Sequence, residues 1–142
     1  MRFIMMHVNS FRSCITEKGR SRVVEPAEPQ ETAVGESVVV LVSVEAGDEE
    51  NPEGVSKRVA GEIEKNARNL KVNTIVLHPF AHLFADLGPP AAAIDILDRV
   101  REALREKGFD AVRTPFGWFN TLEIDAKGHP YSRVARVVRA RD

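Results

Sequence analysis

Residues 37–44 read Ser-Val-Val-Val-Leu-Val-Ser-Val, and this stretch decides the class of fold. It is rich in β-branched residues and is apolar at consecutive positions, so a strand made from it is apolar on both faces. Such a pattern is typical of a strand that is covered on both sides. We therefore predict a buried central strand at residues 37–44.

A helix is predicted directly after this strand. Asn51 is a good N-cap and Pro52 suits the first helical position, because its missing N–H has no partner there in any case. The apolar residues that follow recur on one helical face. They are Val55, Val59, Ile63 and Leu70.

A second helix is predicted to open at Pro89-Pro90 and to end at Lys107-Gly108. A cation near the last turn favours the negative end of the helix dipole, and glycine readily takes the left-handed conformation of a C-cap. The side chains expected to point inward are Ile94, Leu97, Val100 and Leu104.

Five further strands are predicted, at residues 2–8, 73–77, 110–114, 118–124 and 131–138, with a turn at 127–130. Residues 18–36 are charged and contain two prolines, which indicates a long loop or a loosely ordered hairpin. This order of elements predicts an α/β fold: a mixed, largely antiparallel sheet with two packed helices. The length fits one domain, residues 1–142.

The composition is that of an ordinary soluble protein, with 43% hydrophobic and 29% charged residues. The net charge of −1 gives no general attraction to nucleic acid, so any RNA contact needs a local basic patch such as residues 133–141. The single cysteine, Cys14, excludes an internal disulfide and fits a reducing compartment. With neither a signal segment nor a membrane span in the pattern, we expect a cytoplasmic protein.

Two blocks follow strand-like runs and carry the polar groups of a candidate site. The first is His78-Pro79-Phe80-Ala81-His82-Leu83, and the second is Pro115-Phe116-Gly117-Trp118-Phe119-Asn120. Ligands of α/β proteins usually bind where strands end, so the two blocks predict one composite pocket.

The residue types exclude several chemistries. His78 and His82 are four apart, but Pro79 disfavours a helix that would align them. No cysteine or HExxH pattern accompanies them, so neither a metal nor a cofactor is expected. His129 is predicted to be exposed in its turn. No nucleophile signature is present, so the attacking group would be water. His82 can orient that water or cap the turn after it, and position alone does not choose.

The aromatic pair Trp118-Phe119 and the C-terminal arginines could each have either a structural role or a binding role. Trp118 and Phe119 point to opposite faces of a strand, so one is expected in the core and the other could stack on a nucleobase. The arginines of residues 133–141 suit a solvated edge strand and also phosphate contacts.

Taken together, these blocks resemble the N-terminal editing domain of archaeal threonyl-tRNA synthetases, which has the fold of the D-aminoacyl-tRNA deacylases. The matching segments cover nearly the whole chain in the right order. They are His7 in the opening strand and residues 41–45, 51–56, 78–83, 93–97, 115–117 and 127–130.

The resemblance implies hydrolysis of the ester that joins L-serine to the terminal adenosine of threonine tRNA, with help from that adenosine's 2′-hydroxyl. It implies a pocket built largely from main-chain atoms beside His82, a homodimer, and aminoacylation domains in cis or in trans. The substrate-binding residues expected from it and from position are Val44, Glu45, Pro79, Phe80, Ala81, Phe116, Gly117, Trp118 and Phe119.

Two positions depart from the family pattern and are assigned to catalysis together with His82. Asn120 stands where the family has a lysine, and Arg133 where it has a glutamate, so the two could have exchanged charge sign across one pocket. Asn120 still donates and accepts hydrogen bonds but brings no charge. The alternatives are a D-aminoacyl-tRNA deacylase and a catalytically weakened domain that only binds the acceptor end.

Overall fold

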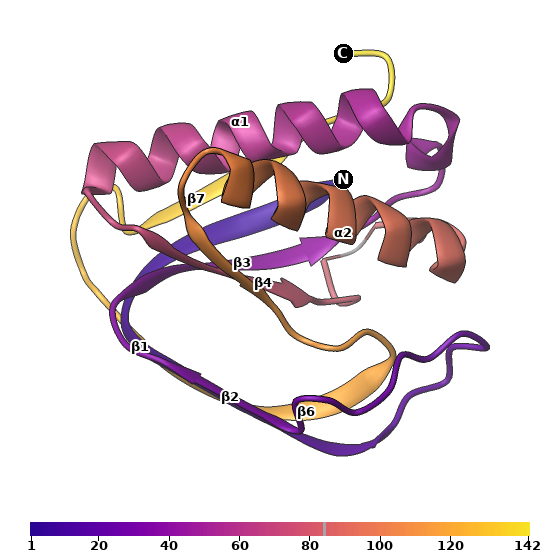
Figure 1. The fold of residues 1–142 in the computed structure, drawn as a ribbon, viewed down its shortest axis with the longest axis horizontal. Coiled ribbons are helices and arrows are strands. Elements are labelled where there is room, and N and C mark those ends of the chain that lie inside the picture. The colour runs from indigo at the N-terminus through magenta and orange to yellow at the C-terminus, as the bar shows by residue number, and fades with distance from the viewer. Residues whose placement is uncertain (84) are drawn as a thin grey trace.

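The computed structural model describes residues 1–83 and 85–142. Figure 1 shows a curled sheet with two helices along one side. The elements are β1 (Arg2–Lys18), β2 (Glu31–Val34), β3 (Ser37–Ser43), the short 3-10 helix η1 (Asp48–Glu50), α1 (Pro52–Leu70), β4 (Thr74–Pro79), α2 (Pro90–Glu106), β5 (Asp110–Arg113), β6 (Trp118–Ala126) and β7 (Arg133–Val137).

The long strand β1 organises the sheet, because four other strands pair with it in antiparallel orientation. β3 and β7 pair with its first half, and β2 and β6 pair with its second half. β3, β4 and β5 then pair in parallel, joined by α1 and α2 as crossover helices. The predicted mixed, largely antiparallel sheet with two helices is confirmed.

β3 is central, as its sequence predicts, and all seven of its residues are buried. Val38, Val40 and Val42 face the core that includes side chains of both helices. Val39 and Leu41 face a second cluster on the other side, formed with residues of β1 and β4. Consecutive apolar residues were needed here because both faces of this strand are covered.

The helix boundaries follow the predicted local signals. The side chain of Asn51 accepts a hydrogen bond from Gly54 N at 3.1 Å, and Gly108 has a φ of +94° just after α2. The inward face of α2 differs by one position from the prediction, because Ile94 is only half-buried while Ile96 is fully buried. No helix in the described ranges is long and apolar enough to cross a membrane.

Two strand boundaries correct the prediction. β1 continues ten residues past the predicted end at Val8, because buried side chains such as Phe11 and Ser13 alternate there with exposed ones. β4 runs to Pro79, so His78 and Pro79 belong to the strand and do not follow it. Within residues 18–36, where a long loop or a loosely ordered hairpin was expected, residues 19–30 form a long loop and β2 then pairs with residues 11–14 of β1.

Candidate active site

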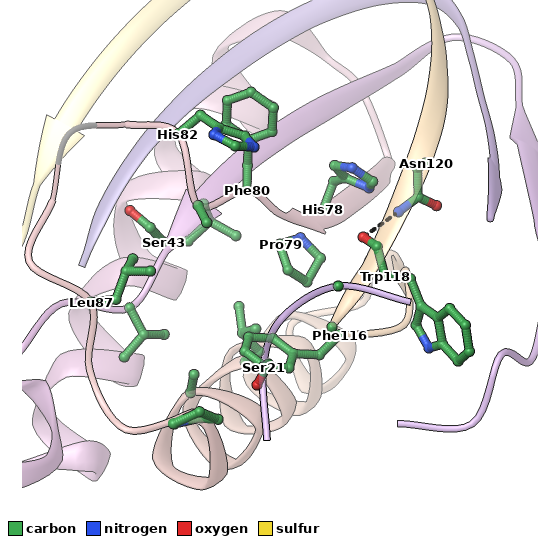
Figure 2. A pocket seen from close by; sticks show the side chains of 18 of the residues that line it. Ser21, Ser43, His78, Pro79, Phe80, His82, Leu87, Phe116, Trp118 and Asn120 are labelled. Carbon is green, nitrogen blue, oxygen red and sulfur yellow. Dashed lines mark hydrogen bonds between the residues drawn. The ribbon is translucent and has the colours of Figure 1, made fainter. Parts of the chain in front are cut away.

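One cavity of about 650 Å³ opens where β3 and β4 end. Its other walls come from the start of β6, from the first turns of α2, and from two loop stretches at residues 19–21 and 87–88. Figure 2 shows side chains from these segments around one space, with Asn120 beside His78 on one side and Leu87 on the other. Most lining side chains are apolar, as in binding sites that exclude water.

His78 forms part of the cavity wall but is almost fully buried. Its Nδ1 lies 2.8 Å from the Thr114 hydroxyl, and its ring packs edge-on against Phe11. Burial lowers the pKa of His78 from the usual 6.5 to about 4. The ring is therefore neutral at pH 7, with one nitrogen able to donate and the other able to accept a hydrogen bond.

The main chain that follows β4 forms part of the cavity wall. Phe80 N donates to Val42 O at 2.8 Å, which fixes the chain as it leaves the strand. Within the described ranges, the next two amides, of Ala81 and His82, donate to no other residue. The His82 ring packs edge-on against the Phe80 ring, with 5.2 Å between centroids. Ala81 and His82 both line the cavity and are exposed, and their amides have no partner among the described residues.

The second block is held by a partly buried ionic cluster, which we name the Arg113 cluster: Arg113, Glu25 and Asp98. Arg113 is only 5% exposed and donates to both Glu25 oxygens at 2.5 and 2.6 Å and to Asp98 Oδ1 at 2.8 and 3.0 Å. Glu25 Oε1 also accepts from Phe116 N at 2.9 Å. Burial alone would raise the pKa of Glu25, but these hydrogen bonds hold it below its usual value.

The same loop contacts the block through its backbone. Trp118 Nε1 donates to Glu25 O at 2.8 Å, and Gly19 N donates to Gly117 O at 2.8 Å. Gly117 has a φ of +96°, which L side chains rarely adopt, and a Cβ on Gly19 would lie 2.8 Å from Gly117 O. Both glycines are therefore required for the loop to form a wall of the cavity.

Comparison with known proteins decides the family. The archaea-specific editing domain of threonyl-tRNA synthetase matches residues 1–138. The chain belongs to this family. Editing domains of this kind are aminoacyl-tRNA deacylases.

The relatives of this editing domain are threonine–tRNA ligases. That of Methanocaldococcus jannaschii is 35% identical over 142 residues, covering 100% of this chain and 23% of the ligase. That of Methanopyrus kandleri is 36% identical over 139 residues, covering 97% of this chain and 22% of the ligase. The chain thus spans under a quarter of the length of these relatives.

A solved structure shows the same fold at low sequence similarity. The c-Myc DNA Unwinding Element Binding Protein superposes with a TM-score of 0.61 at 14% identity, covering 99% of this chain and 100% of that chain. The fold of the editing domain is D-aminoacyl-tRNA deacylase-like, as the sequence resemblance implied.

The structure brings most of the predicted site residues to one cavity. Ten of them line it: Val44, Pro79, Phe80, Ala81, His82, Phe116, Gly117, Trp118, Phe119 and Asn120. Their individual roles stay predictions. Two predicted residues do not line it. The Glu45 carboxylate bonds Arg2 at 2.9 Å, and Arg133 lies exposed at the start of β7.

Three expectations about single side chains need correction. Asn120 pairs with Ile15 of β1 but Arg133 pairs with Met6, nine residues away along the same strand, so the two do not face each other across one pocket. Neither Trp118 nor Phe119 is a core residue: the first is half-buried and the second is 47% exposed. His129 is half-buried, with Nε2 at 2.8 Å from His7 Nδ1.

Residues 19–21 and Ser43 line the cavity although sequence reasoning did not select them. The loop carries no motif, and its contact with Gly117 joins residues almost a hundred positions apart, which no local pattern signals. Ser43 had a usable signal, since it is a polar residue at the end of an apolar strand. Its buried hydroxyl has no hydrogen-bond partner among the described residues.

The Arg113 cluster gives the first testable prediction. Arg113→Met removes the described ion-pair partner of the half-buried Glu25 and should lower the free energy of unfolding by about 2 kcal/mol or more, measured by urea denaturation. The matched control is Arg12→Met, which breaks an exposed pair with Glu31 and should change stability little. Equal, small effects of the two substitutions would show that the cluster does not hold the loop.

His78 gives a second prediction, on pH. Its pKa is about 4 in the folded chain and near 6.5 when unfolded, so the unfolded chain binds more protons between these values, and stability falls as pH falls through this window. Between pH 7 and pH 5 the free energy of unfolding of the parent chain should fall by about 2 kcal/mol more than that of His78→Asn, measured by parallel urea titrations. Equal losses in both proteins would contradict a buried, neutral His78.

Proposed function

We propose that this editing domain hydrolyses L-seryl-tRNA(Thr) and so removes serine that was attached to threonine tRNA by mistake. The observation that supports it most is the recess beside residues 80–82. There, two amides without described partners border an apolar cavity at the ends of β3 and β4. Amides fixed by the fold can stabilise the oxyanion that forms when an ester carbonyl is attacked.

Selection in this proposal depends on size. Serine lacks only the methyl group of threonine, and one methyl group in a binding pocket changes the free energy by roughly 1–3 kcal/mol. In this proposal the part of the cavity beside Val44, Pro79 and Phe80 holds the amino-acid side chain, and these residues contact the position that the additional carbon of threonine would take. A close-packed wall cannot move aside cheaply, so it can discriminate between the two.

The reaction needs no protein nucleophile. The oxygen of a water molecule attacks the ester carbonyl carbon, and the tetrahedral oxyanion accepts hydrogen bonds from the amides of Ala81 and His82. The bond between this carbon and the ribose oxygen then breaks. The ribose oxygen leaves with a proton, which releases serine and tRNA. The neighbouring ribose hydroxyl assists the water, and His82 can orient it.

The proposed partner is the 3′ acceptor end of tRNA(Thr). A cavity of about 650 Å³ is far larger than a seryl group, so it also offers space for the terminal nucleoside. Trp118 and Phe119 at its edge provide aromatic surfaces for a base. We further propose that the domain acts in the cytoplasm as a homodimer, with aminoacylation domains in cis or in trans.

The test is hydrolysis of three substrates by this chain alone: L-seryl-tRNA(Thr), L-threonyl-tRNA(Thr) and a D-aminoacyl-tRNA. We expect the seryl ester to be cleaved at least tenfold faster than the threonyl ester. Faster cleavage of the D-aminoacyl ester would instead support a D-aminoacyl-tRNA deacylase. Binding of seryl-tRNA without turnover would support a domain that only holds the acceptor end.

Asn120→Ala gives a prediction on mechanism. The Asn120 amide donates to Trp118 O at 3.1 Å within its own strand, and it carries no charge that could stabilise an oxyanion. We therefore expect the variant to keep deacylation of seryl-tRNA within about tenfold of the parent, since each tenfold corresponds to only about 1.4 kcal/mol. Complete loss of turnover with unchanged tRNA binding would show that Asn120 is essential.

A further inference from the structure

A basic segment, residues 18–22, forms the rim of the cavity on the side of β1. Gly19, Arg20 and Ser21 line the cavity itself. Arg20 is exposed, and so are Lys18 and Arg22, which flank these three residues in the chain. Arg20 therefore lies at the mouth, between the cavity and solvent, with the other two cations next to the lining residues in sequence.

These three cations are available for a ligand. In the described ranges, none of them forms an ion pair with a carboxylate. Arg12, on the same strand, contrasts with them because it pairs with Glu31 and Glu123. Arg20 is also the only lysine, arginine, aspartate or glutamate among the described residues of the cavity wall. An anion at this mouth would meet positive charge on one side and apolar surface elsewhere.

The basic segment is held in place before any ligand arrives. Gly19 N bonds Gly117 O at 2.8 Å, and Ser21 Oγ donates to Val23 O at 2.8 Å. Further along the same loop, Glu25 is held by its ion pair with Arg113. A fixed backbone reduces the conformational entropy that is lost on binding.

An exposed aromatic side chain lies next to these cations. Lys18 pairs with Trp118 across β1 and β6, and Phe119 follows on β6 with 47% of its surface exposed. Phe119 also lines the cavity. Cations along a groove with an aromatic platform are what sequence-tolerant binding of single-stranded nucleic acid requires.

We propose that the basic segment binds the backbone phosphates of a single-stranded RNA 3′ end, so that the last nucleoside enters the cavity while Phe119 stacks on a base. This inference rests on the proposed function, since it concerns how the same site receives its substrate. Phosphates cannot be buried against the apolar walls without a large desolvation cost, so they remain at the mouth beside Lys18, Arg20 and Arg22. The chain's net charge of −1 makes such a local patch necessary.

The test compares two triple variants with the same change in charge. K18Q/R20Q/R22Q removes the basic segment's cations, and K57Q/K65Q/K71Q removes three exposed cations that lie outside both the cavity wall and residues 133–141. Thermal melts establish that both are folded. The substrates are seryl-tRNA and seryl-adenosine, the second of which has no phosphate.

We expect K18Q/R20Q/R22Q to lower kcat/KM for seryl-tRNA at least tenfold more than kcat/KM for seryl-adenosine. For seryl-tRNA, the slope of log kcat/KM against the logarithm of the salt concentration should become less negative by about 2. Each single-strand phosphate contact contributes roughly 0.7 to this slope, and three cations are removed. The control variant should change neither quantity. Equal losses on both substrates, or no loss on either, would overturn the proposal.

A binding measurement separates this proposal from the proposed function. Fluorescence anisotropy of a labelled RNA hairpin with a single-stranded CCA end reports phosphate contacts without any hydrolysis. If the chain does not cleave seryl-tRNA but binds this RNA at least tenfold more tightly than K18Q/R20Q/R22Q does, the proposed function fails and the basic segment's role stands. Equal affinity of the chain and this variant overturns the basic segment's role.

Discussion

Backbone pairing along β1 is the constraint on which the rest of the structure depends. One strand of 17 residues pairs with four others, two along each half. The pairing with β6 shifts register near Val8, and the second half of β1 bends away from the helices together with β2 and β6 (Figure 1). The ends of β3 and β4 consequently face the start of β6, and the cavity lies between them.

The chemistry of this cavity follows from what lines it. Its walls are mostly apolar and its one buried histidine is neutral, so charge is concentrated at the mouth, where Arg20 lies. The amides that follow Phe80 have no partner among the described residues, and in the proposed mechanism they donate to the developing oxyanion. In the proposed mechanism the substrate brings its own hydroxyl to assist water, and the protein would contribute shape and main-chain dipoles in place of a nucleophile.

Local signals in the sequence predicted much of the fold. Asn51-Pro52 marked the start of α1, Gly108 the end of α2, and consecutive apolar residues the central β3. The continuation of β1 past Val8 was missed because polar Asn9 and Ser10 interrupt the apolar run and the buried positions that follow include polar Ser13 beside Phe11 and Ile15. The loop wall at residues 19–21 depends on the contact between Gly19 and Gly117, which only the folded chain creates. Arg133 matched a family position, but pairing with Met6 places it away from the cavity.

The central claim is that main-chain groups at residues 81 and 82 form a recess that fits serine and excludes threonine. Amide chemical shifts of the isotope-labelled chain test it directly, during titration with non-hydrolysable seryl- and threonyl-adenosine analogues. The expected result is a large shift of the Ala81 and His82 amides with the seryl compound, and binding at least tenfold weaker for the threonyl compound. Equal affinity for the two compounds, or shifts that leave these amides unaffected, would contradict the claim.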